Sequence, residues 1–357
     1  MSSEKEDRRR RQEAERAEYE AVLALPTLGL RHHATITGRP GESRADVSIG
    51  PDGNLVALWT SARDRSALTS ATLSPAGAKF PDPRAPHPVA ARVTTYRPRP
   101  RTFAKLHELP LAHVHVQPLP EERVLVVGAR CRWSPTGPDR NALVYEPDGT
   151  AAAEATLGDG IGRVLTTRTG HIWAGYFDEG IYGNYGWGGH DGPTPIGSDG
   201  LVRFSPDLKQ DWRFPSHYKK PWGAVSSCPT LNIDGDTTWA TYSTSPTGYP
   251  VVRVHDGTVT HWHNDTPARA LAVAGTRAAL LSSYGSHRAA RPGRLTLGTL
   301  SDGAFHPTAR YRLVLPDGSP VPPGTETFGH GADLHFVTDG DWYRVGLDDV
   351  PEGAGGS

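Results

Sequence analysis

The residues IGRVLTTRTGHIWAGY (161–176) read as two β-strands joined by a tight turn, and this pattern decides the fold. Apolar and polar residues alternate on both sides of Gly170, and glycine readily adopts the positive φ that a short hairpin turn requires. The same pattern occurs in ADVSIGPDGNLVALW (45–59) and CPTLNIDGDTTWATY (228–242), with glycine again at the turn. The chain therefore contains a repeated hairpin.

Three weaker copies of this hairpin, at 114–129, 268–284 and 325–339, extend the series to six. The turn positions Gly53 and Ala332 of the first and last copies are 279 residues apart, a mean period of about 56, against ~40–50 for typical propeller blades. The sequence predicts an all-β protein, a six-bladed β-propeller with long inserted loops and a short N-terminal helix. Seven blades would result if the region 60–112 held another, and a β-sandwich or two smaller all-β domains is the alternative fold.

Two more strands are expected after each hairpin. The predicted third strands are 66–73, 141–146, 200–205, 250–255, 293–300 and 341–347, and the predicted fourth strands are 91–97, 151–157, 210–215, 258–263 and 310–315. The sixth unit has no fourth strand before the chain ends. Because an open array would expose a sheet edge, we expect residues 31–38 to supply this strand and close the ring.

The chain divides into a charged helical arm (1–30), one propeller domain (31–350) and a flexible tail (351–357). Residues 4–25 contain no glycine or proline and many strong helix formers. We expect a solvated helix whose last turn docks on the propeller. The alternative is a partner-binding arm that uses Arg8 to Arg11.

Charge and cysteine content limit the partners and the compartment. Lys and Arg number 38 against 39 Asp and Glu, so no net positive field favours nucleic acid or an anionic membrane. No signal peptide or apolar stretch of membrane-spanning length is apparent. Two cysteines are too few for a disulfide framework, and a cytoplasmic protein is expected.

One long loop, 177–199, is expected on the face where second strands connect to third strands, together with the loop 214–227. Loops of this length are usually functional or disordered, and four aromatic residues argue against disorder. The loops supply these ligand-binding candidates: Asp178, Glu179, Tyr182, Tyr185, Trp187, His190, His217, Lys219, Lys220 and Trp222. The cationic segment 97–113 is expected beside them. The alternative is that 177–199 packs on itself and seals the face.

A second group of candidates comes from counting back along the first strands to the channel mouth. Side chains on alternate positions of a strand share one face, so equivalent positions should converge on the axis. The positions are Asp46, His115, Arg163, Cys228, Arg269 and Glu326. They would form either a salt-bridged, water-filled ring or a binding or catalytic site.

Metal and cofactor signals are incomplete. His113 and His115 lie two apart on an expected strand and could meet one divalent metal ion, but a third ligand is not evident. The run from Asn232 to Asp236 lacks the full calcium-loop pattern and is explained by a hairpin turn. No local motif for a hydrolase nucleophile, zinc protease or phosphate-binding loop occurs, so hydrolysis by a local-motif nucleophile is unsupported. The cofactor is left open: a divalent metal is possible, without a full ligand set in the sequence.

The residues GHIWAGYFDEGIYG (170–183) followed by GLVRFSPD (200–207) resemble the propeller repeats of bacterial two-component sensor proteins and the related NHL-type repeats. The resemblance implies the propeller fold and little about activity. We expect a cytoplasmic propeller that binds a small molecule or a partner protein on its loop-rich face. The alternative is an enzyme, a lyase or a lactone hydrolase, acting at the channel mouth.

Overall fold

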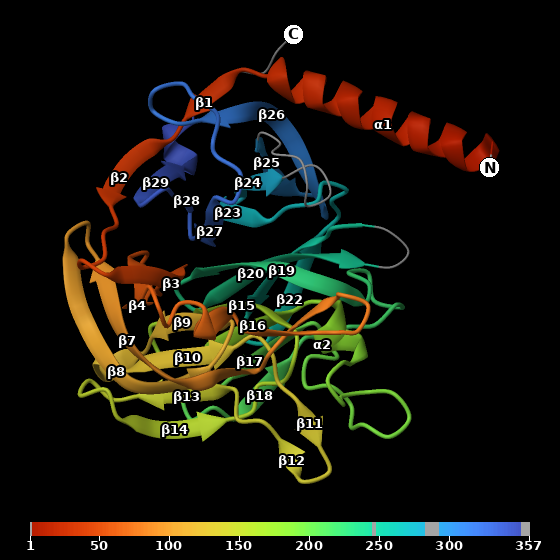
Figure 1. Cartoon of the computed structure of the whole chain (residues 1–357). Helices are drawn as coiled ribbons and strands as arrows, with labels where there is room; N and C mark the ends of the chain where they lie inside the picture. Colours follow the sequence, from red (N-terminus) through yellow and green to blue (C-terminus); the bar gives the residue numbers. More distant parts are fainter. Residues whose placement is uncertain (1, 245–247, 283–292, 351–357) are drawn as a thin grey trace.

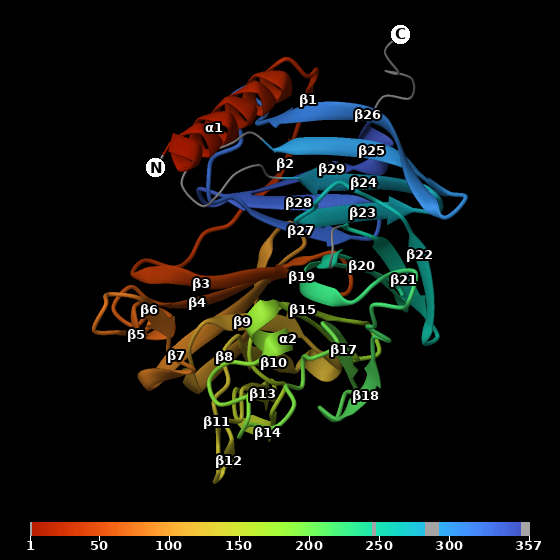
Figure 2. The ribbon, with the colours of Figure 1, turned by 90° about the vertical axis from the view of Figure 1, so that its right-hand side faces the viewer.

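A computed structural model describes residues 2–244, 248–282 and 293–350 of the chain. Six sheets of four or five strands lie around a common centre, and the first strands of neighbouring sheets contact one another (Figures 1 and 2). The predicted six-bladed β-propeller is confirmed. The region 60–112 contributes two strands of blade one and an extra hairpin, rather than a seventh blade.

The blades follow the order of the chain. Blade one comprises β3 (Glu42–Ile49), β4 (Leu55–Ser61), β7 (Arg84–Tyr96) and β8 (Pro100–Leu111). Blade two comprises β9 (Val114–Pro118), β10 (Val124–Gly128), β13 (Ala142–Tyr145) and β14 (Ala151–Ala155). Blade three comprises β15 (Ile161–Thr166), β16 (Ile172–Tyr176), β17 (Leu201–Phe204) and β18 (Gln210–Arg213). Blade four comprises β19 (Val225–Asp234), β20 (Thr237–Thr244), β21 (Val251–His255) and β22 (Thr258–Trp262). Blade five includes β23 (Ala270–Ala274), β24 (Arg277–Ser282), β25 (Arg294–Ser301) and β26 (Ala304–Val314). Blade six comprises β27 (Glu326–His330), β28 (Asp333–Thr338), β29 (Asp341–Gly346) and β2 (Arg31–Thr35).

The turns between first and second strands define one face of the propeller, which we call the hairpin face. At these turns Gly53, Gly170, Gly235 and Gly275 have φ values of 75°, 87°, 58° and 60°, the left-handed region that glycine enters without strain. The connections from second to third strands and from fourth strands to the next blade define the opposite, loop-rich face. It carries the short helix α2 (Asp178–Tyr182) and the hairpin of β11 (Trp133–Ser134) and β12 (Gly137–Pro138).

The hydrophobic core is divided into layers between neighbouring blades. Alternate side chains of each strand point into these layers, so every blade buries apolar residues on both of its faces. The layer between blades six and one contains Trp342, Phe328 and Trp59, together with Ala34 and Ile36 from near the start of the chain. Burial between blades therefore depends on a closed ring.

Blade one differs from the predicted strand assignment. Its third strand is β7 and its fourth is β8, whereas residues 66–73 form a 3-10 turn (Ala67–Thr69) and β5 (Ala71–Leu73), which pairs with β6 (Lys79–Pro81). The expected third strand does not form, because the 3-10 turn buries Leu68 against the apolar residues of blade one. The expected cationic loop is instead a strand, since Ala104 and Leu106 alternate with exposed side chains.

The two ends of the chain close the ring as predicted. β2 pairs antiparallel with β29, in a register that places His32 opposite Tyr343 and Ala34 opposite Trp342. Just before it, β1 (Thr27–Gly29) adds a fifth strand to blade five by pairing parallel with β26. The N-terminal segment thus contributes to two blades.

The helix α1 (Ser2–Leu23) runs beside β26 and projects beyond it (Figure 1). Val22 in its last turn is buried, which confirms the expected docking of the helix end. Arg9 pairs with Glu13 and Arg10 with Glu6 on its exposed surface. In the described part of the chain no helix has the length and apolar run to cross a membrane. The predicted tail 351–357 lies outside the described residues.

Candidate functional site

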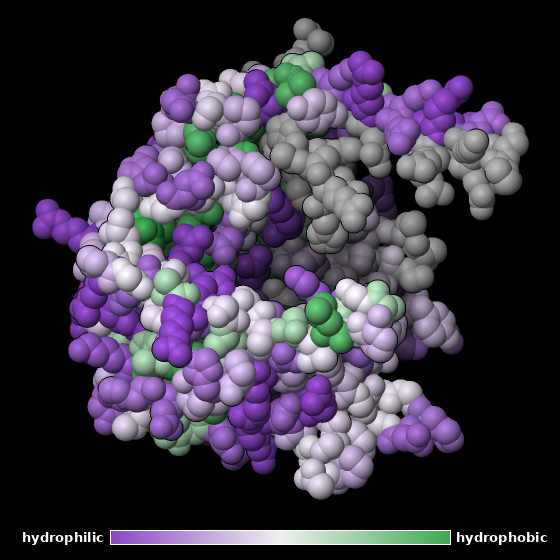
Figure 3. Space-filling model, in the orientation of Figure 1, coloured by the Kyte–Doolittle hydropathy of each residue, from purple (hydrophilic) through white to green (hydrophobic). Residues whose placement is uncertain are grey.

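Four of the six predicted channel residues meet at the loop-rich end of the inner strands. They are Asp46 (blade one), His115 (blade two), Arg163 (blade three) and Glu326 (blade six). Hydrogen bonds across the blade boundaries join these residues or residues within two positions of them in the sequence. We call these four residues the mouth cluster. All four are partly accessible, and the space-filling view is hollowed near its middle, with hydrophilic residues beside the hollow (Figure 3).

Asp46 lies deep in the wall of the mouth. One carboxylate oxygen accepts a hydrogen bond from the backbone N–H of Val116, at 2.7 Å, which fixes the side chain against blade two. Burial raises the pKa of Asp46 to about 7; the Val116 N–H opposes this shift and the nearby Glu326 adds to it. Asp46 can therefore hold or release a proton near neutral pH.

Arg163 crosses the centre of the propeller from blade three to blade six. It donates a hydrogen bond to the carbonyl of Thr327, at 3.2 Å, and its guanidinium carbon lies 4.9 Å from the ring centroid of Phe328. Among the described residues it forms no ion pair within 4 Å, although Asp46 and Glu326 act on it electrostatically. Glu326 is instead paired with Arg44, at 2.7 Å. The mouth cluster thus keeps an arginine fork that no carboxylate of the described chain occupies.

His115 is neutral in this environment. Burial lowers its pKa to about 4, and the charge of Arg163 contributes; a ring nitrogen lies 3.3 Å from the carbonyl oxygen of Ile161. The suggested metal pair with His113 is wrong in its geometry, because His113 precedes β9 with φ 49° and contacts the carbonyl of Ser70. Within the described ranges no group of three or more His, Cys, Asp or Glu side chains could hold a metal.

Cys228 and Arg269 do not join the mouth cluster, contrary to the register prediction. β19 approaches β27 directly, and the amide of Asn232 donates to the carbonyls of Leu271 and Gly331, both at 2.8 Å. β19 thus contacts the first strand of blade six as well as the first strands of blades three and five. Cys228 is fully buried, and burial raises the pKa of its thiol to about 12.

The long loop 177–199 packs on the propeller rather than forming an open wall. Trp187 is only 7% exposed and its indole N–H donates to the carbonyl of Cys131, at 2.9 Å. The Tyr185 hydroxyl donates to the carbonyl of Pro81, at 2.7 Å. Gly180 comes so close to Asp159 that a Cβ atom would lie 2.3 Å from its carbonyl oxygen. These contacts favour the alternative in which the loop seals the face.

Arg130 and Asp159 hold this loop in place, and neither residue was predicted from the sequence. The guanidinium of Arg130 donates two hydrogen bonds to Asp159, at 3.0 and 2.9 Å, and also pairs with Glu179. Its carbon atom lies 4.6 Å from the Tyr185 ring centroid. Arg130 and Asp159 side chains are almost fully buried, so this pair is part of the loop's foundation.

The remaining loop candidates are exposed on the loop-rich face, except Trp222, which is half-buried. Tyr182 is 64% exposed and Tyr218 is 71% exposed, with the His217 ring stacked on Tyr218 at 4.4 Å. Trp222 is tied to its own loop by a hydrogen bond to the Pro215 carbonyl. The other predicted residues are also exposed and are not part of the mouth cluster. They are Asp178, His190, Lys219 and Lys220.

The arginines of segment 97–113 are on the opposite side from their predicted position. Residues 97–99 form the turn between β7 and β8, and Arg97 pairs there with Asp52 of the first hairpin turn. Because both turns belong to the hairpin face, Arg97, Arg99 and Arg101 do not join the loop candidates. The reason is the revised strand order in blade one.

Comparisons with known proteins find structural likeness only. No protein-family model and no curated protein sequence matches the chain. It is similar to BamB from Moraxella catarrhalis, at 8% identity over 89% of this chain and 100% of that chain, with a TM-score of 0.43. It is also similar to the extracellular domain of the putative one component system BT4673 from B. thetaiotaomicron (11% identity, 88% of this chain, 40% of that chain, TM-score 0.39).

A third similar structure is the β-propeller domain of the Trilobed protease from Pyrococcus furiosus, at 8% identity over 85% of this chain and 82% of that chain, with a TM-score of 0.41. Of the resemblance to sensor and NHL-type repeats, the propeller fold is confirmed by the six sheets. A family is not identified by sequence.

Proposed function

We propose that the protein is a binding propeller that takes a small polar molecule at the mouth cluster, on the loop-rich face. The observation that carries this proposal is the set of contacts that Arg163 makes. Its guanidinium is held by the Thr327 carbonyl and the Phe328 ring but has no carboxylate within ion-pair distance among the described residues. An arginine fork placed in this way suits a carboxylate or phosphate group.

The chemistry of the other groups narrows the ligand class. Asp46 and Glu326 can accept hydrogen bonds, and neutral His115 can donate or accept one. A ligand that carries an anionic group for Arg163 and a hydrogen-bond donor for Asp46 would complement the cluster. Small amino acids and hydroxy acids have this combination.

The proposed location is the cytoplasm. Cys131 and Cys228 are both unpaired and buried, which supports a reducing compartment. The long loop is proposed to act as a rigid border of the face rather than as a lid, because Trp187 and Tyr185 are anchored to other segments.

The test is ligand-induced stabilisation. A panel of α-amino and α-hydroxy acids is added to the protein, and the thermal midpoint and calorimetric affinity are measured. We expect at least one compound to stabilise the wild-type protein and to lose affinity in Arg163→Gln. Asp46→Asn serves as a second variant, and Arg140→Gln, which changes an exposed arginine of blade two, is the matched control. Equal binding by Arg163→Gln and the control would contradict the proposal.

A second candidate function is catalysis at the same place, favoured by Asp46. A carboxyl with a pKa of about 7 next to an arginine can act as a general acid or base on a bound anion. A lyase or a hydrolase of lactones would use such a group. If the protein is an enzyme, Asp46→Asn should abolish turnover of the bound compound while leaving its affinity within a few-fold, and a binding protein would show no turnover at all.

A further inference from the structure

We propose a second ligand site on the hairpin face, in a cavity between blades one and two that is suited to an aromatic phosphate monoester. The cavity has a volume of about 390 Å³, within the range of small-molecule sites. It lies at the opposite end of the blades from the mouth cluster, since Asp52 and Asn54 of the first hairpin turn line it. The proposal is independent of the function proposed above.

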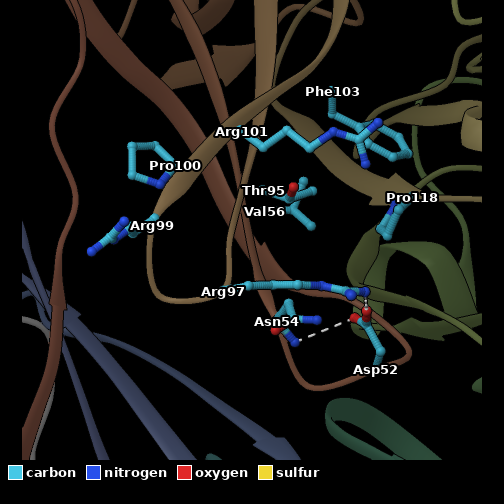
Figure 4. Close-up of a pocket in the computed structure, with 10 residues that line it drawn as sticks. All are labelled: Asp52, Asn54, Val56, Thr95, Arg97, Arg99, Pro100, Arg101, Phe103 and Pro118. Atoms are coloured by element: carbon cyan, nitrogen blue, oxygen red, sulfur yellow. Dashed lines mark hydrogen bonds and ion pairs between the residues drawn. The ribbon is translucent and has the colours of Figure 1, made fainter.

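Two arginines of one hairpin form the charged side of this cavity. Arg97, directly after β7, and Arg101, near the start of β8, extend in the same direction on either side of Thr95 and Val56 (Figure 4). Arg99, between them in the sequence, points away from both (Figure 4). The turn therefore aims two of its three arginines at one space.

Each of the two arginines is held by a carboxylate from a different turn. Arg97 pairs with Asp52 of blade one, and Arg101 with Glu122 of blade two, at 2.5 Å. One carboxylate can occupy only part of the five N–H donors of a guanidinium group. The pairs thus position both forks while leaving donors for a ligand anion.

The rest of the lining is apolar. Val56, Phe103, Pro100 and Pro118 contribute to it, so an aromatic group can be buried beside the arginines. A second cavity of about 330 Å³ shares Arg97, Phe103 and Pro118 and continues toward Arg168 of blade three. A dianionic phosphate satisfies two arginines better than a carboxylate does, and an attached ring would occupy the apolar lining.

The experiment measures binding of phenyl phosphate by calorimetry at low ionic strength, with inorganic phosphate and benzoate as comparison probes. We expect phenyl phosphate to bind at least tenfold more tightly than either. Arg101→Ala should weaken its binding about tenfold or more, because a charge-assisted contact is lost. Arg99→Ala is the matched control: it removes the same charge from the same hairpin, and we expect less than a twofold effect.

Thermal melts of both variants establish that they are folded, and Arg101→Gln provides a second substitution at the same exposed position. Equal weakening by Arg99→Ala and Arg101→Ala would reduce the effect to general electrostatic attraction and overturn the proposal. It would also be overturned if phenyl phosphate bound no more tightly than inorganic phosphate or benzoate, or did not bind at millimolar concentration. Unchanged binding in Arg163→Gln would confirm that this site is separate from the mouth cluster.

Discussion

Asp46 is a carboxyl whose protonated form the folded protein favours. Its pKa is about 7 in the folded state and about 4 in an unfolded chain, so the folded state binds the proton more tightly. The stability that this adds is complete below pH 4 and is lost as the pH rises through 7. A neutral asparagine of the same shape does not undergo this loss.

We therefore expect Asp46→Asn to have nearly the thermal midpoint of the wild-type protein at pH 4–5 and a midpoint higher by about 2 °C or more at pH 8. Differential scanning calorimetry of both proteins across this range tests the prediction. Titrating groups that do not interact with Asp46 contribute equally to both proteins, so their contributions cancel in the difference. A constant difference between pH 4 and pH 8 would show that Asp46 is not the titrating group.

Arg130 is the residue on which the buried charge of Asp159 depends. Burial raises the pKa of Asp159, and Arg130 acts in the opposite direction. Replacing Arg130 with methionine would leave a buried carboxylate without its partner, which costs roughly 3–5 kcal/mol. We expect urea unfolding to show a loss of this size in Arg130→Met and a smaller loss in the double variant Arg130→Met/Asp159→Asn. Equal losses in the two variants would mean that packing, and not charge, sets the cost.

At this scale the sequence predicted part of the site. Counting along alternating strands placed Asp46, Arg163 and Glu326 together correctly, because first strands of neighbouring blades share one geometry. The same count failed for Cys228, since the register of β19 shifts between Ser227 and Thr230 and interrupts the regular alternation that the count assumes. Arg130 could not be predicted, because its partners are set by the path of a loop.

The loop 177–199 behaves as a structural element and not as a lid. Its ring of contacts through Trp187, Tyr185 and Arg130 makes it part of the packed molecule. We expect Trp187→Ala to lower the free energy of unfolding by roughly 3–5 kcal/mol, the usual cost of removing a buried tryptophan. Tyr182→Ala, at an exposed position of the same loop, should change it by less than about 0.5 kcal/mol.

Chemical denaturation of the two variants measures both values. A small effect of Trp187→Ala combined with loss of ligand binding would restore the view of the loop as a pocket wall.

Four of the six first hairpins were predictable as elements, because each combines period-two alternation with a glycine at the turn, and all four glycines have positive φ. Blade one misled the prediction at its third and fourth strands. β8 is rich in arginine and proline near its start, a composition typical of loops. Its identity as a strand depends on pairing with β7 over a long antiparallel ladder, which composition does not report.

The whole molecule is a ring whose last blade is completed by the first strand of the propeller domain. Removing residues 1–41 would delete β1 and β2, expose the edge of β29 and remove Ala34 and Ile36 from the core between blades six and one. We expect this truncated protein to aggregate or unfold. Removing residues 1–20 should be tolerated, because Val22 and both strands remain.

Size-exclusion chromatography and thermal melts of the two truncated proteins test the closure. A stable, monomeric protein that begins at residue 42 would contradict it, and unfolding of the protein that begins at residue 21 would assign a structural role to the solvated part of α1.

The pairing of β2 with β29 has a consequence for how the protein is made. The partners of residues 31–35 lie at residues 341–344, so they leave the ribosome only after all five other blades have been synthesised. At ~5–20 residues per second, the 309 residues between His32 and Asp341 take roughly 15–60 s to follow. During that time β2 has no partner and the core side of Ala34 is uncovered. The early chain therefore needs another means of staying soluble, and α1, with its exposed ion pairs, is made before β2 and is available during this time.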